Sequence, residues 1–222
     1  IVMRLVGSEM CIRDRVYVPG SSGYGLDGIG CTSPVTTTDA SQYNVVRGVF
    51  ANGGNQNGGS VWMNGIQEVT SSGCSNTGGN FFEIGGRTCG DASFDFRIFK
   101  GNIAEVVVYD EDLSMMDDWK VETYLGVKYG IHLAHDYLAS DGTVLWDSSA
   151  MANYHHDVTG IGVDSATCLD QKQSINGSSD AIVTMGLGSI ATDNASNGNT
   201  FAADKSFMLW GNNNGATECT NY

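Results

Sequence analysis

Histidine and carboxylate side chains gather most closely at His155, His156 and Asp157, so metal chemistry is considered there first. A transition-metal site needs three or four such ligands. The nearest additional ones in the sequence are His135, Asp136 and Asp164. Adjacent residues of a β-strand point to opposite faces, which makes His155 and His156 poor partners for a single ion. We therefore favour a polar loop that enters a strand over a metal site.

Calcium suits the composition better, because it takes oxygen ligands from Asp, Asn and main-chain carbonyl groups. Two segments are rich in such oxygens, Asp110–Asp112 and the loop Asp193–Asn199. Neither has the ligand spacing of a known calcium-binding loop. Solvated polar surface is the favoured interpretation of both segments. No cofactor is predicted, and calcium stays an open alternative.

Hydrolytic chemistry lacks its usual residue patterns. Glycosidases need two carboxylates that face each other across a cleft, and Glu105 stands alone in its apolar segment. The sequence also lacks the motifs G-x-S-x-G, H-E-x-x-H and G-x-x-x-x-G-K-[ST], which carry nucleophilic, zinc and phosphate chemistry. We therefore predict that the chain is not an enzyme.

Aromatic side chains offer a different function, because exposed rings stack on sugars while neighbouring Asn and Asp side chains form hydrogen bonds. Trp146 and Tyr154 are the predicted ligand-binding residues. Trp62 and Trp210 stand among apolar residues in predicted strands, and we expect them in the core. Exposure of Trp146 and Tyr154 in a shared groove would favour binding over a purely structural role.

The charge balance excludes some partners. The sequence has 11 Lys and Arg against 25 Asp and Glu, a net charge of -14, so it lacks the basic surface that nucleic-acid binding requires. No apolar run approaches the roughly 20 residues that a membrane-spanning helix needs. With 30 Gly and only 2 Pro in 222 residues, the sequence indicates many turns between short strands. We therefore expect a mainly β protein without a membrane span.

The first fifteen residues differ from the rest of the chain. Leu5–Arg15 reads LVGSEMCIRDR, which matches the in-frame translation of a transposon-based sequencing adapter. A signal peptide would need an apolar core, which Glu9, Arg13 and Asp14 interrupt. We expect residues 1–15 to be non-native, genuine sequence to begin near Val16, and the upstream part of the first domain to be missing.

Cysteine usage favours an oxidising compartment. Without Cys11, five cysteines remain, and none forms a C-x-x-C pair that is typical of zinc sites. Cys74 and Cys89 bracket a Gly-, Asn- and Ser-rich loop, and we predict a disulfide between them. Cys168 and Cys219 are a second candidate pair, while the partner of Cys31 stays open.

Hydrophobic patterns divide the chain into two β-rich modules joined by a helix. Residues 16–112 form the first module, 113–131 the connecting helix and 132–222 the second module. Ser114 is predicted to cap the start of the helix and Gly130 its end. Its predicted apolar face consists of Trp119, Val121, Tyr124, Leu125 and Tyr129.

Predicted strands of the first module cover Tyr43–Phe50, Ser60–Met63, Phe81–Ile84, Phe94–Phe99 and Ile103–Tyr109. The last of these is almost wholly apolar, which is typical of a strand buried on both faces. Asn64-Gly65 predicts a tight turn in the first module, and Asp141-Gly142 predicts one in the second. Further strands are expected in the segments DVTGIGVD, AIVTMGLGSIA and KSFMLWGNNNG.

The segment FKGNIAEVVVYDEDLSMMDDWKVETYLGVKYGI resembles the closing strand and helix of bacterial concanavalin-A-like (laminin-G-like) lectin domains. The upstream segments VRGVFANGGNQNGGSVWMNG and FFEIGGR keep the order of the same family. The resemblance implies part of a β-sandwich of the jelly-roll type that lacks its first half. Residues 132–222 resemble a β-rich domain of unknown function that follows lectin-like domains in large secreted surface proteins.

Together these features predict a non-catalytic module of a secreted or cell-surface bacterial protein that binds carbohydrate or mediates adhesion. Its expected partners are a polysaccharide or cell-surface glycan and other domains of the same parent chain. One alternative is a structural spacer in a large surface protein. A fragment of a glycoside hydrolase is a third and less favoured interpretation.

Overall fold

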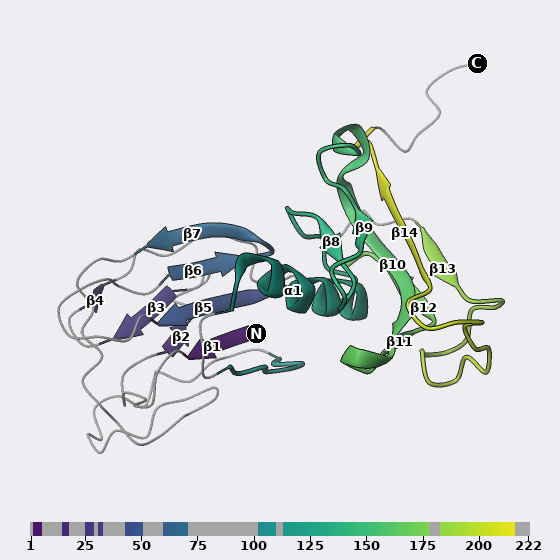
Figure 1. Ribbon diagram of the computed structural model, residues 1–222, viewed down its shortest axis with the longest axis horizontal. Coiled ribbons are helices and arrows are strands. Elements are labelled where there is room, and N and C mark those ends of the chain that lie inside the picture. The colour runs from purple at the N-terminus through teal and green to yellow at the C-terminus, as the bar shows by residue number, and fades with distance from the viewer. Residues whose placement is uncertain are drawn as a thin grey trace. The chain divides into compact units, whose positions relative to one another are not determined.

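A computed structural model of the chain (Figure 1) describes residues 2–5, 15–17, 25–28, 31–32, 43–50, 60–70, 102–109, 113–177 and 183–215. The secondary structure in these ranges is mainly β, with several small sheets and one α-helix, as the sequence predicted. The chain divides into two compact units, Ile1–Leu113 and Ser114–Tyr222. Each unit is described by itself.

The first unit contains a four-stranded sheet in the order β1-β5-β6-β7. Its strands are β1 (Val2–Leu5), β5 (Val46–Phe50), β6 (Ser60–Met63) and β7 (Ile66–Thr70). A second sheet joins β2 (Arg15–Tyr17), β3 (Gly25–Gly28) and β4 (Cys31–Thr32). The described core of this unit consists of the buried side chains of Val45, Val46, Val61 and Met63.

The central hairpin of the first unit agrees with its predicted pattern. β5, β6 and β7 pair antiparallel, and β6 has the predicted bounds. Asn64 and Gly65 connect β6 to β7 with φ angles of 49° and 88°. Two consecutive positive φ angles are what a two-residue turn between twisted strands requires, and Asn-Gly is the sequence that adopts them most readily.

One strand predicted for the first unit does not form. Ile103–Tyr109 is no regular strand: among the described residues only a single bridge forms, at Val107, and Val108 is exposed. An apolar β-branched run favours an extended chain, but a strand also needs a hydrogen-bonded neighbour along its length. The predicted strands Phe81–Ile84 and Phe94–Phe99 lie outside the described residues.

Part of the segment that we expected to be non-native is paired. β1 lies within residues 1–15 and runs parallel to β5, with Val2 opposite Arg47 and Leu5 opposite Phe50. A β-ladder is built from main-chain hydrogen bonds, which any non-proline sequence can supply. The pairing therefore does not depend on the origin of the segment.

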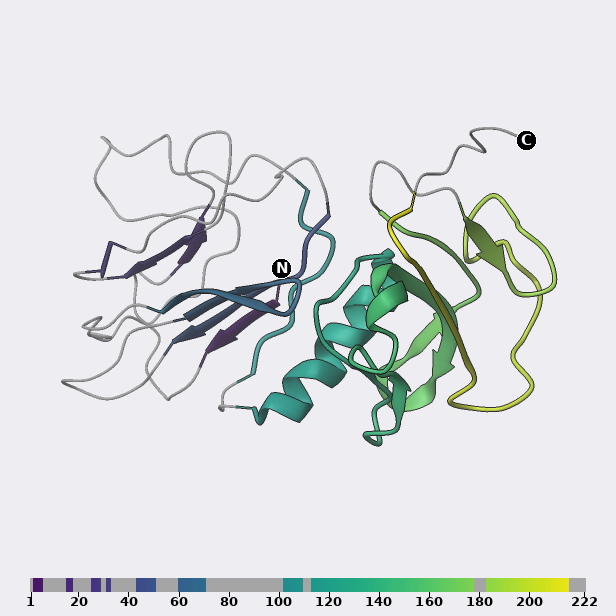
Figure 2. The ribbon, with the colours of Figure 1, turned by 90° about the horizontal axis from the view of Figure 1, so that it is seen from above.

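The second unit places helix α1 (Met115–Tyr129) against small antiparallel sheets (Figure 2). One sheet has the order β11-β10-β14, and β8-β9 and β12-β13 are separate pairs. The strands are β8 (Tyr137–Leu138), β9 (Val144–Trp146), β10 (His156–Asp164), β11 (Leu169–Gln171), β12 (Gln173–Ile175), β13 (Thr184–Gly186) and β14 (Phe207–Asn212). Short 3₁₀ helices η2 (Ala152–Tyr154) and η3 (Ser165–Thr167) flank β10.

Both predicted caps of α1 are confirmed. The Ser114 side chain accepts a hydrogen bond from the Asp117 main-chain N–H, and Gly130 adopts a left-handed conformation with φ 67°. Gly130 also lies against β12, because a Cβ atom there would be 2.1 Å from the Ile175 carbonyl oxygen. Only glycine combines a left-handed conformation with the absence of a Cβ atom. This cap therefore fixes the helix end to the sheet.

The predicted apolar face of α1 is largely wrong. Only Leu125 of its five residues is buried, and the others are partly exposed. The buried positions of the helix are Asp118, Glu122, Thr123, Leu125, Gly126 and Val127. The helix contacts β8, β10, β11 and β12, so it is part of the second unit rather than a separate connection. It buries a partly polar face because the facing chain supplies hydrogen-bond partners for that face.

Leu125 is 3% exposed and gives a direct test of this packing. Leu125→Ala should lower the free energy of unfolding by about 2–5 kcal/mol, the usual cost of truncating a buried leucine. Met116 lies on the same helix and is 42% exposed, so Met116→Ala is the matched control and should be close to neutral. Denaturant titration measures both, and equal effects would contradict the observed helix orientation.

Candidate functional site

A buried polar contact joins α1 to the chain that follows it. His135 Nε2 lies 2.6 Å from Glu122 Oε2, and the two side chains are 6% and 1% exposed. The Trp119 ring stacks on His135, with ring centroids 4.9 Å apart and planes 4° from parallel. The helix places Trp119 and Glu122 three residues apart, which brings both side chains to one face of α1.

The hydrogen-bond partners of the His135 ring determine which of its nitrogens carries a hydrogen. His135 Nδ1 lies 2.6 Å from the main-chain oxygen of Asp136, and a carbonyl oxygen can only accept. Nδ1 therefore carries a hydrogen. A single proton then lies between Nε2 and the Glu122 carboxyl group, and it belongs to either partner. Either way, both ring nitrogens are satisfied inside the unit.

Further polar side chains tie α1 and β8 to β10. The Leu138 N–H donates to the Thr123 hydroxyl at 2.9 Å. The Tyr137 hydroxyl accepts from the Leu133 N–H at 2.8 Å and donates to the Val158 carbonyl at 3.1 Å. Burial raises the pKa of Tyr137 well above its ordinary value, so the hydroxyl keeps the proton that it donates.

A second imidazole cluster lies next to these residues. His132 and His155 meet edge to face, with ring centroids 4.9 Å apart. The Val158 N–H donates to His132 Nδ1 at 3.3 Å, and the Trp146 indole N–H donates to His155 Nδ1 at 3.0 Å. Trp146 and His155 are also ring neighbours, 6.4 Å between centroids. One connected group of contacts thereby joins His132, Trp146, His155 and Val158.

Burial opposes a positive charge on both of these rings. It lowers the pKa of His132 from 6.5 to about 4, and the neighbouring His155 adds to the effect. Burial likewise lowers the pKa of His155, although the Ala134 carbonyl and Asp136 act in the opposite direction. His155 Nε2 is buried and forms no hydrogen bond of good geometry. Both rings are therefore neutral near pH 7.

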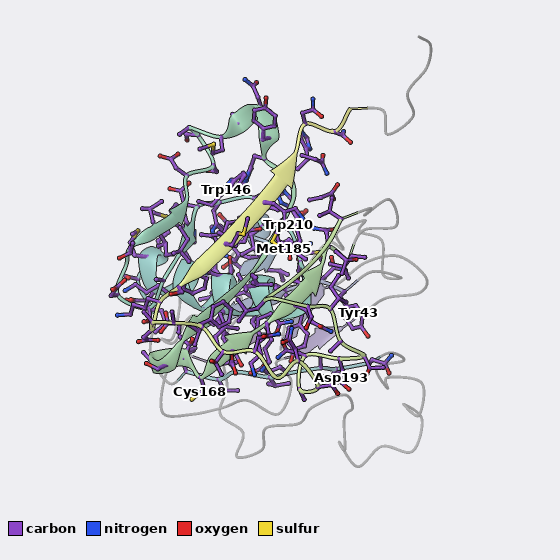
Figure 3. The ribbon with its side chains drawn as sticks, turned by 90° about the vertical axis from the view of Figure 1, so that its right-hand side faces the viewer. Tyr43, Trp146, Cys168, Met185, Asp193 and Trp210 are labelled. Atoms are coloured by element: carbon purple, nitrogen blue, oxygen red, sulfur yellow. The ribbon has the colours of Figure 1, made fainter. Side chains whose placement is uncertain are left out.

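The two predicted ligand-binding residues have different surroundings. Tyr154 is 56% exposed, as a sugar-stacking residue requires. Trp146 is half-buried, lies next to β14 in Figure 3, and uses its indole N–H within the unit. Both residues precede His155 in the sequence, and the Trp146 indole N–H donates to His155 Nδ1. Of the two, only Tyr154 presents a largely exposed ring.

Trp62 and Trp210 are both half-buried, so their expected place in the core is only partly correct. Arg47 lies over the Trp62 ring at 4.2 Å from its centroid, and the Trp62 indole N–H donates to Ser60. An aromatic ring with a polar edge can cover a core while part of it stays exposed, which strand patterns do not reveal.

Three exposed asparagines follow the part of β14 that lies against the Tyr154 main chain. A Cβ atom on Gly211 would lie 2.3 Å from the Tyr154 carbonyl oxygen, so this glycine lets β14 approach η2 closely. His156 pairs with Asn212, and the Asn212 amide donates to Asp157 at 2.8 Å. Asn212, Asn213 and Asn214 are all exposed. Figure 1 shows the β9–β10 connection at the same end of the unit as the end of β14. We call Tyr154 together with Asn212–Asn214 the aromatic tip.

His155 and His156 have different surroundings, but His155 ends η2 and lies outside β10, so the alternation of side chains along a strand is not the cause. His155 is partly buried against His132, whereas His156 is exposed. Over the described ranges, no three His, Cys, Asp or Glu side chains are grouped so that they could hold a metal ion. The residues named as additional ligands have internal partners: His135 binds Glu122, Asp136 accepts from Ser148, and Asp164 accepts from Ser140.

The loop Asp193–Asn199 uses its oxygens to shape its own main chain. Asp193 accepts from the Ser196 N–H, Asn194 from the Lys172 N–H and Asn197 from the Asn199 N–H. Asn197 is 1% exposed and donates to the carbonyls of Leu187 and Ser189. These contacts account for the Asn-rich composition without a cation. The other calcium candidate, Asp110–Asp112, lies outside the described residues.

Asp164 is a structurally important carboxylate, for which the sequence suggested only the role of an additional metal ligand. It is 2% exposed and accepts three hydrogen bonds, from the Ser140 N–H, the Ser140 hydroxyl and the Ala166 N–H. Lys205 forms an ion pair with Asp141 at 2.9 Å in the neighbouring turn. Glu122 was missed as well; its only sequence signal is a charge among the apolar positions of a short helix.

Cys168 is a free, exposed cysteine, and its candidate partner Cys219 lies outside the described residues. Its φ angle of 56° ends η3 in a left-handed conformation. The predicted pair Cys74 and Cys89 lies outside the described residues.

Comparison with known proteins gives one match. Residues 117–222 match the family model described as "Domain of unknown function (DUF8202)", which covers nearly all of the second unit. No curated protein and no solved structure matches the chain. Over the ranges that the structure describes, no helix combines the length and hydrophobicity needed to cross a membrane.

Removal of the Glu122 carboxylate tests the buried contact. Glu122→Ala should lower the free energy of unfolding by about 3–5 kcal/mol, because it leaves His135 buried without its partner. The double variant Glu122→Ala/His135→Ala should cost less than the sum of the two single variants. Asp117→Asn, which removes an exposed ion pair with Lys120 on the same helix, is the control and should have little effect. Additive losses in denaturant titration would contradict the coupling.

Acid stability tests the burial of His132. The pKa in the folded chain is about 4 against an ordinary 6.5, so between these values the unfolded chain binds a proton that the folded chain excludes. Stability should be unaffected by this group above pH 6.5 and fall as the pH drops toward 4, by at most about 3 kcal/mol.

The matched variant is His132→Asn, whose side-chain oxygen can accept from Val158 but does not titrate in this range. Urea titrations at several pH values should show a flatter pH dependence for His132→Asn than for the unchanged chain. Identical slopes would exclude His132 as the acid-sensitive group.

Proposed function

We propose that the chain is a non-catalytic part of a secreted or cell-surface protein and that its second unit binds carbohydrate at the aromatic tip. The observation that carries the proposal is the exposed Tyr154 ring, together with three exposed asparagines that follow the part of β14 lying against the Tyr154 main chain. An aromatic face can stack on the apolar face of a sugar ring. The Asn212 and Asn213 side-chain oxygens each accept one main-chain N–H, and an amide oxygen has a second lone pair that can accept from a sugar hydroxyl group. Gly211 supports this arrangement by allowing η2 and β14 to approach closely.

The surroundings of the tip also favour an uncharged ligand. The nearest charged side chain with a described contact there is Asp157, and the whole sequence carries a net charge of -14. Negative charge repels acidic polysaccharides, so neutral glycans are the expected class. Tyr154 replaces the pair Trp146 and Tyr154 as the central binding residue, because Trp146 is half-buried and donates to His155.

A concanavalin-A-like sandwich for residues 16–112 belongs to the same proposal. Its support is the antiparallel order β5-β6-β7 with the Asn-Gly turn, together with the sequence resemblance of this region to such lectins. Other domains of the parent chain would then be the structural partners of both units. Cell-surface location follows from the same resemblance.

A structural spacer is the second candidate. The observation that favours it is that several polar side chains form hydrogen bonds within the unit, at Glu122, Asp164 and Asn197. Such contacts stiffen short strands and long connections, which suits a module that holds other domains apart. A spacer needs no exposed aromatic ring, so Tyr154 discriminates between the two candidates.

Carbohydrate binding is tested on the full chain with a glycan array, with and without calcium, followed by affinity measurement for the glycans that bind. Tyr154→Ala should weaken binding by roughly tenfold, which is typical when a key aromatic contact is truncated. Tyr43 is 58% exposed and lies in the first unit, so Tyr43→Ala is the matched control and should leave the affinity unchanged.

Three results would contradict parts of the proposal. Absence of binding to every glycan would favour the spacer. Binding that Tyr154→Ala does not weaken would exclude the aromatic tip as the site. Release of reducing sugar from a bound polysaccharide would exclude a non-catalytic role.

A further inference from the structure

Two neighbouring imidazole rings in the second unit are each approached by an N–H group at Nδ1. The Val158 main-chain N–H points at His132, and the Trp146 indole N–H points at His155. A nitrogen that accepts a hydrogen bond carries no hydrogen itself. Both rings must therefore be neutral and have their hydrogen on Nε2 while these contacts exist.

We propose that the chain of contacts Trp146–His155–His132–Val158 is an acid-labile latch that is closed while both rings are neutral and opens when either ring gains a proton. Protonation at Nδ1 would set a ring N–H against the N–H of its present donor, so the hydrogen bond would be lost. A proton on one ring also places positive charge against the other ring, 4.9 Å away between centroids. Opening would release Trp146, and with it the connection from β9 through η2, from its contact with His155.

The latch is a property of the fold and does not depend on carbohydrate binding. The contacts join positions that are distant in sequence: Trp146 is nine residues from His155, and Val158 is 26 residues from His132. Together they fasten the β9–η2 connection to the chain that follows α1 and to β10. Loss of one contact therefore loosens a defined segment and leaves the rest of the unit connected.

The surrounding charged groups do not cancel the effect of burial on the two histidine rings. Asp157 and His156 on β10 and His135 on the segment before β8 act on His132, while Asp136, His135 and His156 act on His155. Glu122 of α1 is occupied by His135, Asp136 accepts from Ser148, and Asp157 accepts from Asn212. Asp136 and Asp157 favour a charged ring, but burial is the larger influence and lowers the pKa of both histidines.

The first measurement uses the unchanged full chain. Two-bond ¹H–¹⁵N correlation spectra distinguish the two neutral forms of each histidine ring. At about pH 7.5, His132 and His155 should both carry their hydrogen on Nε2, the form that the two donors require. A hydrogen on Nδ1 of either ring would overturn the proposal, because the corresponding donor could not bind there.

The second measurement follows hydrogen exchange of the Trp146 indole N–H, expressed relative to free tryptophan at the same pH. Its protection should fall on the order of tenfold between about pH 7 and pH 4.5 as the latch opens. In His155→Asn the amide oxygen can accept from Trp146 without titrating, so protection should change little over the same range. His156→Asn is the matched control, since His156 is the exposed neighbour, and should behave like the unchanged chain.

The outcomes separate clearly. A loss of protection in acid that His155→Asn prevents and His156→Asn does not prevent supports the latch. Constant protection in the unchanged chain, or an equal loss in His155→Asn, overturns it. If His155→Asn does not fold, the ring forms and the indole protection of the unchanged chain still decide the question.

Discussion

The second unit depends on the contact between Glu122 of α1 and His135 of the segment that follows α1. This contact places a carboxyl group and an imidazole ring out of water. Two such groups are costly to bury, and they are tolerated because each satisfies the other and the Asp136 carbonyl satisfies the remaining ring nitrogen. The contact fixes the rotation of α1 about its axis. Thr123 then meets the Leu138 N–H, and Leu125 meets the core.

The same principle extends to the sheets and loops of this unit. Apart from β10 and β14, its strands have two or three residues and provide few main-chain hydrogen bonds, and polar side chains supply further connections. Asp164 organises the turn that holds Ser140, and Asn197 organises the long connection between β13 and β14. His132 and His155 act in this way as acceptors, which makes the structural role of these rings sensitive to their protonation. Tyr154, by contrast, stays 56% exposed.

Sequence alone determined the features whose physical causes lie within a few residues. Ser114 and Gly130 set the ends of α1, because the bonds that satisfy a helix end involve only neighbouring residues. Asn64-Gly65 and Asp141-Gly142 set two turns for the same reason, since Asn64, Gly65 and Gly142 are residue types that readily adopt the positive φ angles found there. The mainly β character and the positions of several strands also follow from local composition. For the candidate site, sequence identified Tyr154 as an aromatic residue near polar neighbours.

Only the tertiary structure decided which side chains meet. The buried face of α1 is partly polar because its polar side chains have hydrogen-bond partners in the following chain. Glu122 contacts His135, 13 residues away, and Thr123 accepts from the Leu138 N–H, 15 residues away. The indole of Trp146 belongs to an internal contact with His155 rather than to an open binding face. Hydrogen-bond partners at such separations leave no periodic signal, because burial of a polar group depends on whether another part of the chain satisfies it. Local patterns thus determined where elements begin and end, and long-range satisfaction of polar groups decided which faces they bury.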